Sequence, residues 1–480
     1  MVQSTLHRSG PKQAPVEPRR AATVRRATVR RAPAALLALV AIGAGFRLWA
    51  LGVNRLGYDE AFTAVAGRLS IGGLFDFLRA HDSHPPLDYL IHLPLARLGA
   101  DELLMRLPSA ACSIAALALF AWWMRPRGFA GIVATGLFAI SAFELVHGRH
   151  ARMYAEMELI GVGAAVIAEL WLRRPKRWHA PAISALVLIG LLTHVSMFLL
   201  GAGLLALAGR RVDREAWRWR VALGSGVIGW ALLWGPSFLV QTQGGHSDWI
   251  PRTTLPRVVH EFGRLVTYQP TLHALVLVAV LAGLWVLHRV DAKLGRVWVC
   301  CVLVPTALAA LSGTVAPVLL DRTFTVVSWG PFLAIGFLVA ALTRRSKLLG
   351  AAVIAALLLV MVPSAVQVVA TRQNPDGVLR HLERVAGPGD VLAIHPGGRL
   401  AEIEWSLGVR SGAPYRVVAV RGLEGTAGIA RRAGPTSGRL WLLDWAQQPL
   451  PAPSAPRCAP DWAGAGAHVY CLRQAPAAAG

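Results

Sequence analysis

The chain has 480 residues, of which 55% are hydrophobic and only 16% charged, and its mean hydropathy is +0.49. A soluble protein carries about a quarter charged residues, so this composition excludes an ordinary soluble domain and predicts an all-α membrane protein with many spans. The net charge of +23 would suit nucleic-acid binding, but the placement of the basic residues, described below, argues against a nucleic-acid partner.

Residues 1–33 are polar, proline-rich and basic, and are predicted to form a disordered cytoplasmic tail. Arginine pairs precede the first apolar segment, as expected of a positive-inside anchor. A twin-arginine export signal and a nucleic-acid arm are the alternatives. Because no cleavage site of the small-residue type follows, the first apolar segment is expected to stay in the chain as a span.

Apolar segments of bilayer-spanning length recur along the next part of the chain and predict about eleven spans. One continuous stretch, 179–209, is too long for a single span without strong tilt, so it is predicted as two short helices broken near Thr193 and His194. The predicted spans are 34–53, 103–123, 128–145, 151–171, 179–193, 195–209, 219–239, 271–289, 296–314, 324–342 and 347–369.

Basic residues gather in alternate loops between these spans. If the N-terminus is cytoplasmic, the basic loops at 125–127, 173–177, 209–220, 288–296 and 344–347 all fall on the inner side, and Asp213, Glu215 and Asp291 are their acidic residues. This is the positive-inside pattern. It predicts a multi-pass protein of a bacterial cytoplasmic membrane, with the C-terminus extracytoplasmic because the number of spans is odd.

The first outer loop, 54–102, contains two further apolar patterns of helical spacing, at 61–79 and 87–98. Neither is long enough to span, so both are predicted as helices lying in the membrane interface. Asp59 and Glu60 precede the first of these helices, and His84-Pro85-Pro86 forms the corner between them.

Residues 371–480 differ in character from the preceding part, which we treat as one transmembrane domain over 34–370. Short alternating runs predict strands near 390–394, 415–420, 439–444 and 468–472, with helices at 376–385 and 425–432. They predict a small extracytoplasmic α/β domain. An oxidising compartment would allow Cys458 and Cys471 to form a disulfide, whereas Cys112, Cys300 and Cys301 fall within spans.

The predicted topology collects carboxylates, imidazoles and arginines on one outer face. A carboxylate there could act as a general base, arginines could hold a phosphate, and carboxylates with histidines could bind a divalent cation such as Mg, Mn, Ca or Zn. These parts suit group transfer from a lipid phosphate. The residues are Asp59, Glu60, His81, Asp82, His84, Asp88, Glu144, His147, Arg149, His150, Arg152, His194, His246, Asp248, Asp321 and Arg322.

Four short motifs occur in order along the chain: Gly57-Tyr58-Asp59-Glu60-Ala61, His84-Pro85-Pro86-Leu87-Asp88-Tyr89, Arg106-Leu107-Pro108-Ser109 and Ala151-Arg152-Met153-Tyr154-Ala155. In this order they resemble the bacterial type C (GT-C fold) membrane glycosyltransferases, which are related to protein O-mannosyltransferases and to the aminoarabinose transferase of lipid A. The resemblance covers about residues 35–345.

The resemblance implies an inverting glycosyltransferase whose donor is a polyprenyl-phosphate sugar and whose acceptor is an envelope glycan, lipid or protein. Asp59 matches the family's catalytic carboxylate, with Glu60 beside it. Arg149 and Arg152 match the corner near the donor phosphate, and His84 occupies the proline-rich corner of the first loop. Two departures concern His150, where relatives often have glutamate, and Arg322, which is followed by Thr323 where many have tyrosine.

Structural alternatives accompany each of these roles. Asp59 could cap the following helix, Glu60 could support its neighbours, and Arg152 could pair with Glu156. His84, His147, His150 and His194 are candidates for substrate or metal binding, or are solvated or helix-capping residues. A transporter or flippase for a polyprenyl-linked or anionic lipid is the alternative function, although no internal repeat supports it. A non-catalytic envelope-assembly protein is a third possibility.

Overall fold

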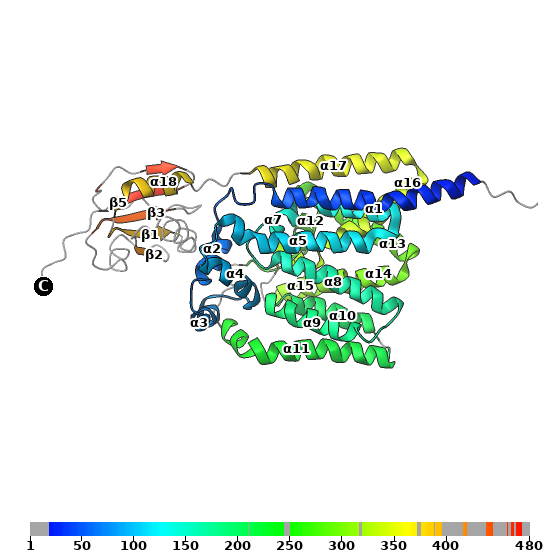
Figure 1. Cartoon of the computed structure of the whole chain (residues 1–480), viewed down its shortest axis with the longest axis horizontal. Helices are drawn as coiled ribbons and strands as arrows, with labels where there is room; N and C mark the ends of the chain where they lie inside the picture. The colour runs from blue at the N-terminus through cyan, green and yellow to red at the C-terminus, as the bar shows by residue number, and fades with distance from the viewer. Residues whose placement is uncertain are drawn as a thin grey trace, which may run out of the picture.

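The computed structural model describes residues 19–209, 211–243, 250–315, 319–371, 376–387, 389–395, 416–419, 438–444, 458, 462–464 and 467–472. Most of these residues form a bundle of helices, and the C-terminal ones form a small sheet beyond one end of the bundle (Figure 1). The helices α2, α3 and α4 of the first loop lie at that same end (Figure 1).

The first long helix, α1 (Arg19–Leu48), begins well before the apolar segment. The prediction of disorder was therefore wrong for residues 19–33, and residues 1–18 lie outside the described part. Good helix formers, alanine and arginine, dominate this stretch and favour a helix without any apolar face.

The first loop contains α2 (Tyr58–Ala66), α3 (Ile71–His81) and α4 (Leu87–Arg97). The single helix predicted over 61–79 is thus divided, because the Ser70 hydroxyl accepts a hydrogen bond from the Gly73 amide at 3.0 Å and starts a new helix there. The α4 helix agrees with the prediction for 87–98. Gly67 marks the break, since a Cβ at this position would lie 2.7 Å from Ala96 Cβ on α4.

The bundle helices follow the predicted spans closely, and several begin at side-chain caps. Asp101, Asp213 and Ser346 each accept a backbone amide hydrogen bond at the start of the following helix. The helices are α5 (Glu102–Met124), η1 (Arg125–Arg127), α6 (Gly128–Ala139), α7 (Ala142–Gly148), α8 (Tyr154–Arg173), α9 (His179–Thr193), α10 (Met197–Ala208), α11 (Arg214–Gln241), α12 (Leu255–Arg264), η2 (Pro270–Leu272), α13 (His273–Val290), α14 (Ala292–Trp298), η3 (Val299–Leu303), α15 (Val304–Val315), η4 (Asp321–Val327), α16 (Trp329–Arg345) and α17 (Lys347–Ala370).

One predicted break is found in the structure, and two predicted spans are interrupted. The stretch 179–209 is two helices, as predicted, with the break at residues 194–196. The span predicted at 128–145 ends at Ala139, because Ser141 caps the separate helix α7. The span predicted at 324–342 is bent by 63° between η4 and α16, and this bend places Arg322 outside the straight part of the helix.

By length and composition, five helical stretches in the described residues could cross a membrane, or six if the bent pair counts as one span. The helices α9 and α10 and the apolar part of α1 are shorter apolar helices. The chain is therefore a multi-pass membrane protein. The number of eleven crossings and the orientation stay predictions.

A buried polar network joins four helices inside the bundle. Arg47 of α1 donates to the Ser113 hydroxyl on α5 at 2.7 Å and to the Ala139 carbonyl on α6 at 3.1 Å. Ser113 in turn donates to Glu158 of α8 at 3.1 Å. Gly148 packs over this network, since a Cβ there would lie 2.4 Å from the Ser113 hydroxyl oxygen. A charge buried in apolar surroundings needs such partners.

The C-terminal sheet has the strand order β2-β1-β3-β5-β4, formed by β1 (Val391–His395), β2 (Arg416–Ala419), β3 (Leu440–Asp444), β4 (Trp462–Gly464) and β5 (Ala467–Leu472). Strands β1, β2 and β3 are parallel, whereas β5 pairs antiparallel with β3 and β4. Helix α18 (Asp376–Val385) packs its apolar residues, including Val378 and Leu382, into the sheet core.

These elements confirm the α/β character predicted for the C-terminal region, including four of the strands and the helix at 376–385. The short β4 was not predicted, and the helix predicted at 425–432 lies outside the described residues. Cys458 and Cys471 form a disulfide with a Cα–Cα distance of 5.3 Å, as the sequence predicted. Cys112, Cys300 and Cys301 are free thiols.

Candidate active site

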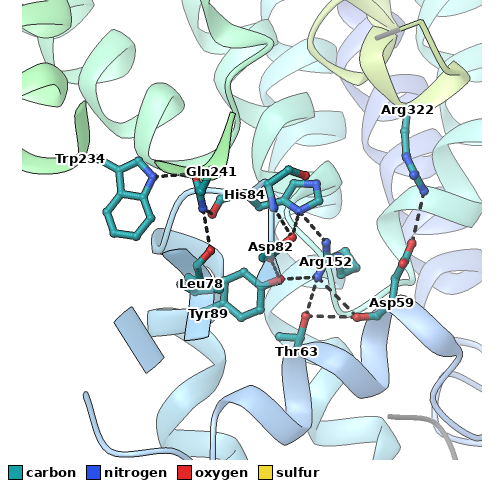
Figure 2. A network of polar contacts seen from close by, with 11 residues as sticks. Asp59, Thr63, Leu78, Asp82, His84, Tyr89, Arg152, Trp234, Gln241 and Arg322 are labelled. Carbon is teal, nitrogen blue, oxygen red and sulfur yellow. Dashed lines mark hydrogen bonds and ion pairs between the residues drawn. The ribbon is translucent and has the colours of Figure 1, made fainter. Parts of the chain in front are cut away.

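Asp59 lies in the first turn of α2, with a side chain that is 41% exposed. Its Oδ2 atom is 3.3 Å from Nη1 of Arg322 (Figure 2). Arg322 lies in η4, 263 residues later in the chain. The Arg322 side chain is 29% exposed. This half-exposed ion pair places a carboxylate and a guanidinium side by side where a ligand could reach both.

Arg152 lies at the centre of the polar network in Figure 2. Its Nη1 donates to the Tyr89 hydroxyl at 2.8 Å and to the Thr63 hydroxyl at 3.1 Å, and lies 3.5 Å from the Asp59 carbonyl oxygen. Its Nη2 lies 3.3 Å from His84 Nδ1, while its Nε is buried without a hydrogen-bond partner. Arg152 therefore connects α2, α4 and the corner at His84, and the Asp59 backbone is part of this connection.

Asp82 organises the corner of the first loop. One of its oxygens lies 2.7 Å from His84 Nδ1 and also accepts the Ser83 amide at 2.7 Å, and the other accepts a hydrogen bond from the Tyr89 hydroxyl. Burial by itself would raise the pKa of Asp82, but His84, Arg152 and Tyr89 together hold it below its usual range. An ionised Asp82 thus orients His84 and, through Tyr89, Arg152.

The corner is also tied to the rest of the bundle. Gln241, at the end of α11, donates to the carbonyls of Leu78 and His84 at 3.0 and 3.1 Å, and its own carbonyl accepts from Trp234 (Figure 2). The ring of His194, in the break between α9 and α10, lies 5.4 Å from the ring of His84. Its Nδ1 lies 2.9 Å from the Ser196 hydroxyl and accepts the Ser196 amide. The helix-break position thereby brings His194 to the site.

Glu60, next to Asp59, has entirely different surroundings. Its carboxylate forms a two-pronged ion pair with Arg106 of α5, with both N–O distances 2.7 Å, and also accepts the amides of Gly57 and Ala151. Although burial by itself raises the pKa of Glu60, the hydrogen bonds and charge of Arg106 lower it to about 2. Because both oxygens are occupied and the side chain is buried, the geometry favours a supporting role for Glu60 over direct catalysis.

Arg149 contacts the end of a helix and none of the site carboxylates. Its Nη1 donates to the carbonyls of Phe46 and Trp49 at 2.7 Å each, at the C-terminus of α1. A basic side chain at this position satisfies carbonyls that have no partner within the helix. The structure therefore gives the predicted phosphate-binding role no support and shows Arg149 as a cap of α1.

The remaining histidine candidates, His147 and His150, belong to no metal-binding group among the residues that the structure describes. His147 is buried, with both ring nitrogens unpartnered, and is surrounded by the rings of Phe143, Tyr154 and His150 at 4.3 to 6.5 Å. The described residues contain no group of three or more His, Cys, Asp or Glu side chains that could hold a metal ion. His246 and Asp248 lie outside the described residues.

The structure brings five of the predicted residues into one connected site: Asp59, His84, Arg152, His194 and Arg322. The sequence reasoning assigned no role to Tyr89, Thr63, Arg106 and Gln241, and named Asp82 only as one of many outer charges. Tyr89 and Arg106 fall within the motifs quoted above, so their position offered a signal. Thr63 lies four residues after Asp59, one helical turn away on the same face.

The chain has an ArnT-like type C glycosyltransferase fold. It superposes on the crystal structure of ArnT from Cupriavidus metallidurans in the apo state with a TM-score of 0.59 and 15% sequence identity, over 91% of this chain and 97% of that one. The structure of ArnT from the same organism bound to undecaprenyl phosphate gives a TM-score of 0.57, with the same identity and coverage. No family model matches the sequence, and no curated protein matches it either.

Proposed function

We propose that this protein transfers a sugar from a polyprenyl-phosphate donor to an acceptor hydroxyl at the outer face of the bacterial cytoplasmic membrane. The observation that carries the proposal is the half-exposed pair of Asp59 and Arg322, next to the buried Arg152, in a fold shared with ArnT. One ArnT structure holds undecaprenyl phosphate, which supports a polyprenyl phosphate as the lipid part of the donor.

Asp59 is the proposed general base. It is the site carboxylate that combines partial exposure with a neighbouring guanidinium, whereas Glu60 is buried and Asp82 is occupied by its neighbours. A base must reach the proton it removes, and exposure permits this. The position of Asp59 in the first turn of α2 also fits the alternative role near a helix N-terminus; the two roles are compatible.

Arg322 and Arg152 are the proposed donor-phosphate ligands. A guanidinium binds phosphate through charge-assisted, often two-pronged hydrogen bonds. Arg322 is partly exposed, and Arg152 has a buried Nε without a partner. A phosphate held by Arg322 and Arg152 would bring the anomeric carbon that it carries within reach of an acceptor hydroxyl beside Asp59.

The proposed step is a single displacement at the sugar's anomeric carbon. Asp59 takes the proton of the acceptor hydroxyl, and the acceptor oxygen forms a bond to the anomeric carbon. The bond between that carbon and the phosphate oxygen breaks, and polyprenyl phosphate leaves with the electron pair. Attack from the face opposite to the leaving group inverts the anomeric configuration. Preorganised arginines stabilise the charge that develops on the phosphate.

We propose the sugar only as a hexose or a pentose. The acceptor is proposed as an envelope glycan, lipid or protein. Dependence on a divalent cation stays a prediction. It is tested by measuring sugar transfer by the purified protein after treatment with a chelator. Because the described residues form no cluster suited to a metal ion, the proposed step uses side chains only.

We further infer that the N-terminus is cytoplasmic, and that the site and the region 371–480 are extracytoplasmic. One hydrogen bond supports this arrangement: the Asn54 side chain donates to the Thr371 carbonyl at 2.9 Å. Asn54 follows α1, and Thr371 follows α17. The first loop and the C-terminal region therefore leave the bundle at one end, as Figure 1 also shows, whereas the basic loops connect helices at the other. A membrane-impermeant thiol reagent applied to single-cysteine variants at 76 and 345 tests this orientation.

The experiment that tests the function compares Asp59→Asn with the wild-type chain in membranes supplied with radiolabelled polyprenyl-phosphate sugars. Loss of a general base lowers the rate by about 10²- to 10⁴-fold, and the variant should keep the melting temperature of the wild type. Asp76→Asn is the matched control, because Asp76 lies in the same loop with a side chain that is 78% exposed.

Transfer at the wild-type rate by a folded Asp59→Asn variant would remove Asp59 from the role of base. A variant that no longer transfers sugar but still moves the labelled lipid between leaflets would favour the lipid transporter instead. Determination of the anomeric configuration of the product by NMR separates inversion from retention.

A further inference from the structure

A cavity lies at the opposite end of the bundle from the candidate active site. Its volume is about 560 Å³, and it is formed where α8, α13 and α14 meet the connection between α10 and α11. Its lining residues are Leu172, Arg211, His288, Ala292, Lys293, Arg296 and Val299. Three of these side chains carry a positive charge and none is acidic.

The carboxylates nearest in sequence to this cavity are already engaged. Asp291 pairs with Arg173 and accepts the Leu294 amide at 3.1 Å. Asp213 pairs with Arg211 at 2.8 Å and accepts the Ala216 amide at 2.9 Å. In the described residues, neither Lys293 nor Arg296 forms an ion pair with a carboxylate, so their positive charges are not neutralised within the protein.

Arg296 and Arg211 also make contacts with uncharged groups. Arg296 Nη2 donates to the Leu207 carbonyl at 2.9 Å. The guanidinium of Arg211 lies 5.0 Å from the ring centroid of Trp171, a buried residue on α8. Both contacts leave other guanidinium N–H groups for a ligand. Arg211 and Arg296 are therefore positioned by contacts within the protein, and Lys293 beside them is exposed.

We propose that this cavity binds a phosphate group. A basic pocket between membrane helices is a typical site for an anionic lipid headgroup, and a volume of this size is in the range of small-molecule sites. The apolar wall of Leu172, Ala292 and Val299 beside the cations matches a phospholipid, whose phosphate adjoins its acyl chains, better than free inorganic phosphate. A lipid bound here would contact the C-terminal end of α8, the connection between α10 and α11, and the junction of α13 and α14, away from the candidate active site.

The test is native mass spectrometry of the full chain in detergent, titrated with phosphatidylglycerol and, separately, with zwitterionic phosphatidylcholine. The wild-type protein should bind phosphatidylglycerol more tightly. Lys293→Gln should weaken this binding by about tenfold, the loss expected for one charge-assisted contact, and Arg211→Gln combined with Lys293→Gln should weaken it further. Lys347→Gln, at the exposed start of α17 on the same end, is the matched control.

A second arm measures whether inorganic phosphate raises the melting temperature of the wild type but not of Lys293→Gln. Stabilisation by phosphate without selective lipid binding would support a free anion as the ligand. Equal affinity of the wild type and the Lys293→Gln variant for phosphatidylglycerol, with no effect of inorganic phosphate, would overturn the proposal. So would an equal loss of binding in Lys347→Gln, because it would indicate general surface attraction.

Discussion

Asp59 and Glu60 are neighbours on α2 but belong to two regions of opposite character. Around Glu60, the carboxylate, Arg106 and the amides of Gly57 and Ala151 form a closed, buried set. Around Asp59, the carboxylate is 41% exposed and has Arg322 as its side-chain partner at 3.3 Å. One region has its hydrogen-bonding capacity filled by the protein, and the other has capacity left for a ligand.

The difference follows from helix geometry. Consecutive residues on a helix point about 100° apart, so a helix that buries Glu60 against α5 turns Asp59 towards the site. The Glu60 region anchors the start of α2 and the corner before α8, and this anchoring fixes where Asp59 and Arg152 lie. We therefore expect substitutions in the Glu60 region to change stability, and substitutions in the Asp59 region to change activity.

The largest stability effect is expected for Glu60→Gln. Breaking a buried ion pair leaves Arg106 buried without its counter-ion, which costs about 3–5 kcal/mol. Unfolding of the purified protein in detergent by urea measures this loss. A variant with wild-type stability but greatly reduced transfer would reverse the assignment and return Glu60 to a direct catalytic role.

Glu60 also predicts a pH dependence of stability. Its pKa in the folded protein, about 2, is below the ordinary value of 4.5, so the folded state binds this proton less readily than the unfolded state. The stabilisation, about 3 kcal/mol, is complete above pH 4.5 and is lost as the pH falls towards 2. Unfolding curves across this range should show a smaller loss in Glu60→Gln than in the wild type, because Asp82, whose pKa is also lowered, still contributes in the variant.

Arg322→Gln tests the region of Asp59. Loss of a charge-assisted contact to phosphate is expected to weaken donor use by about 10- to 100-fold, while stability changes by less than about 1 kcal/mol because the pair with Asp59 is partly exposed. The measurement is the KM for the polyprenyl-phosphate sugar. Arg252→Gln, an exposed arginine that precedes α12, is the control, and an unchanged KM for Arg322→Gln would contradict the proposed phosphate contact.

The smallest effect is expected for Arg149→Gln. The substitution removes hydrogen bonds to the carbonyls at the end of α1 and should lower stability by about 1–2 kcal/mol with no change in KM for the donor. Thermal unfolding and the transfer assay together decide this. A raised KM at unchanged stability would restore the phosphate-binding role that the motif order implies for Arg149.

The sequence allowed much of the fold to be predicted because hydrophobic segments and helix caps act locally. The break near His194, the helix at 87–98, the helix at 376–385 and the disulfide all agree with the prediction. The errors occurred where one polar residue overrides an apolar run, as Ser70 and Ser141 do by starting new helices, or where an arginine-rich segment forms a helix without an apolar face, as at 19–33.

For the candidate site, the motif order indicated Asp59, Arg152 and His84 as members, but it could not rank Asp59 above Glu60. That ranking depends on which carboxylate meets Arg106 from α5, a contact across 46 residues. The partners of Arg149 could not be predicted for the same reason, because they are carbonyls at the end of α1 about 100 residues away.

Composition, apolar periodicity and the alternation of basic loops by themselves determined that this is a multi-pass helical membrane protein with a small C-terminal α/β region. They depend on the identity of each residue and its near neighbours. The different surroundings of Asp59 and Glu60, the pairing of Asp59 with Arg322 and the basic cavity at the opposite end were decided by packing. Each brings together groups from helices distant in sequence, and local patterns carry no record of such contacts.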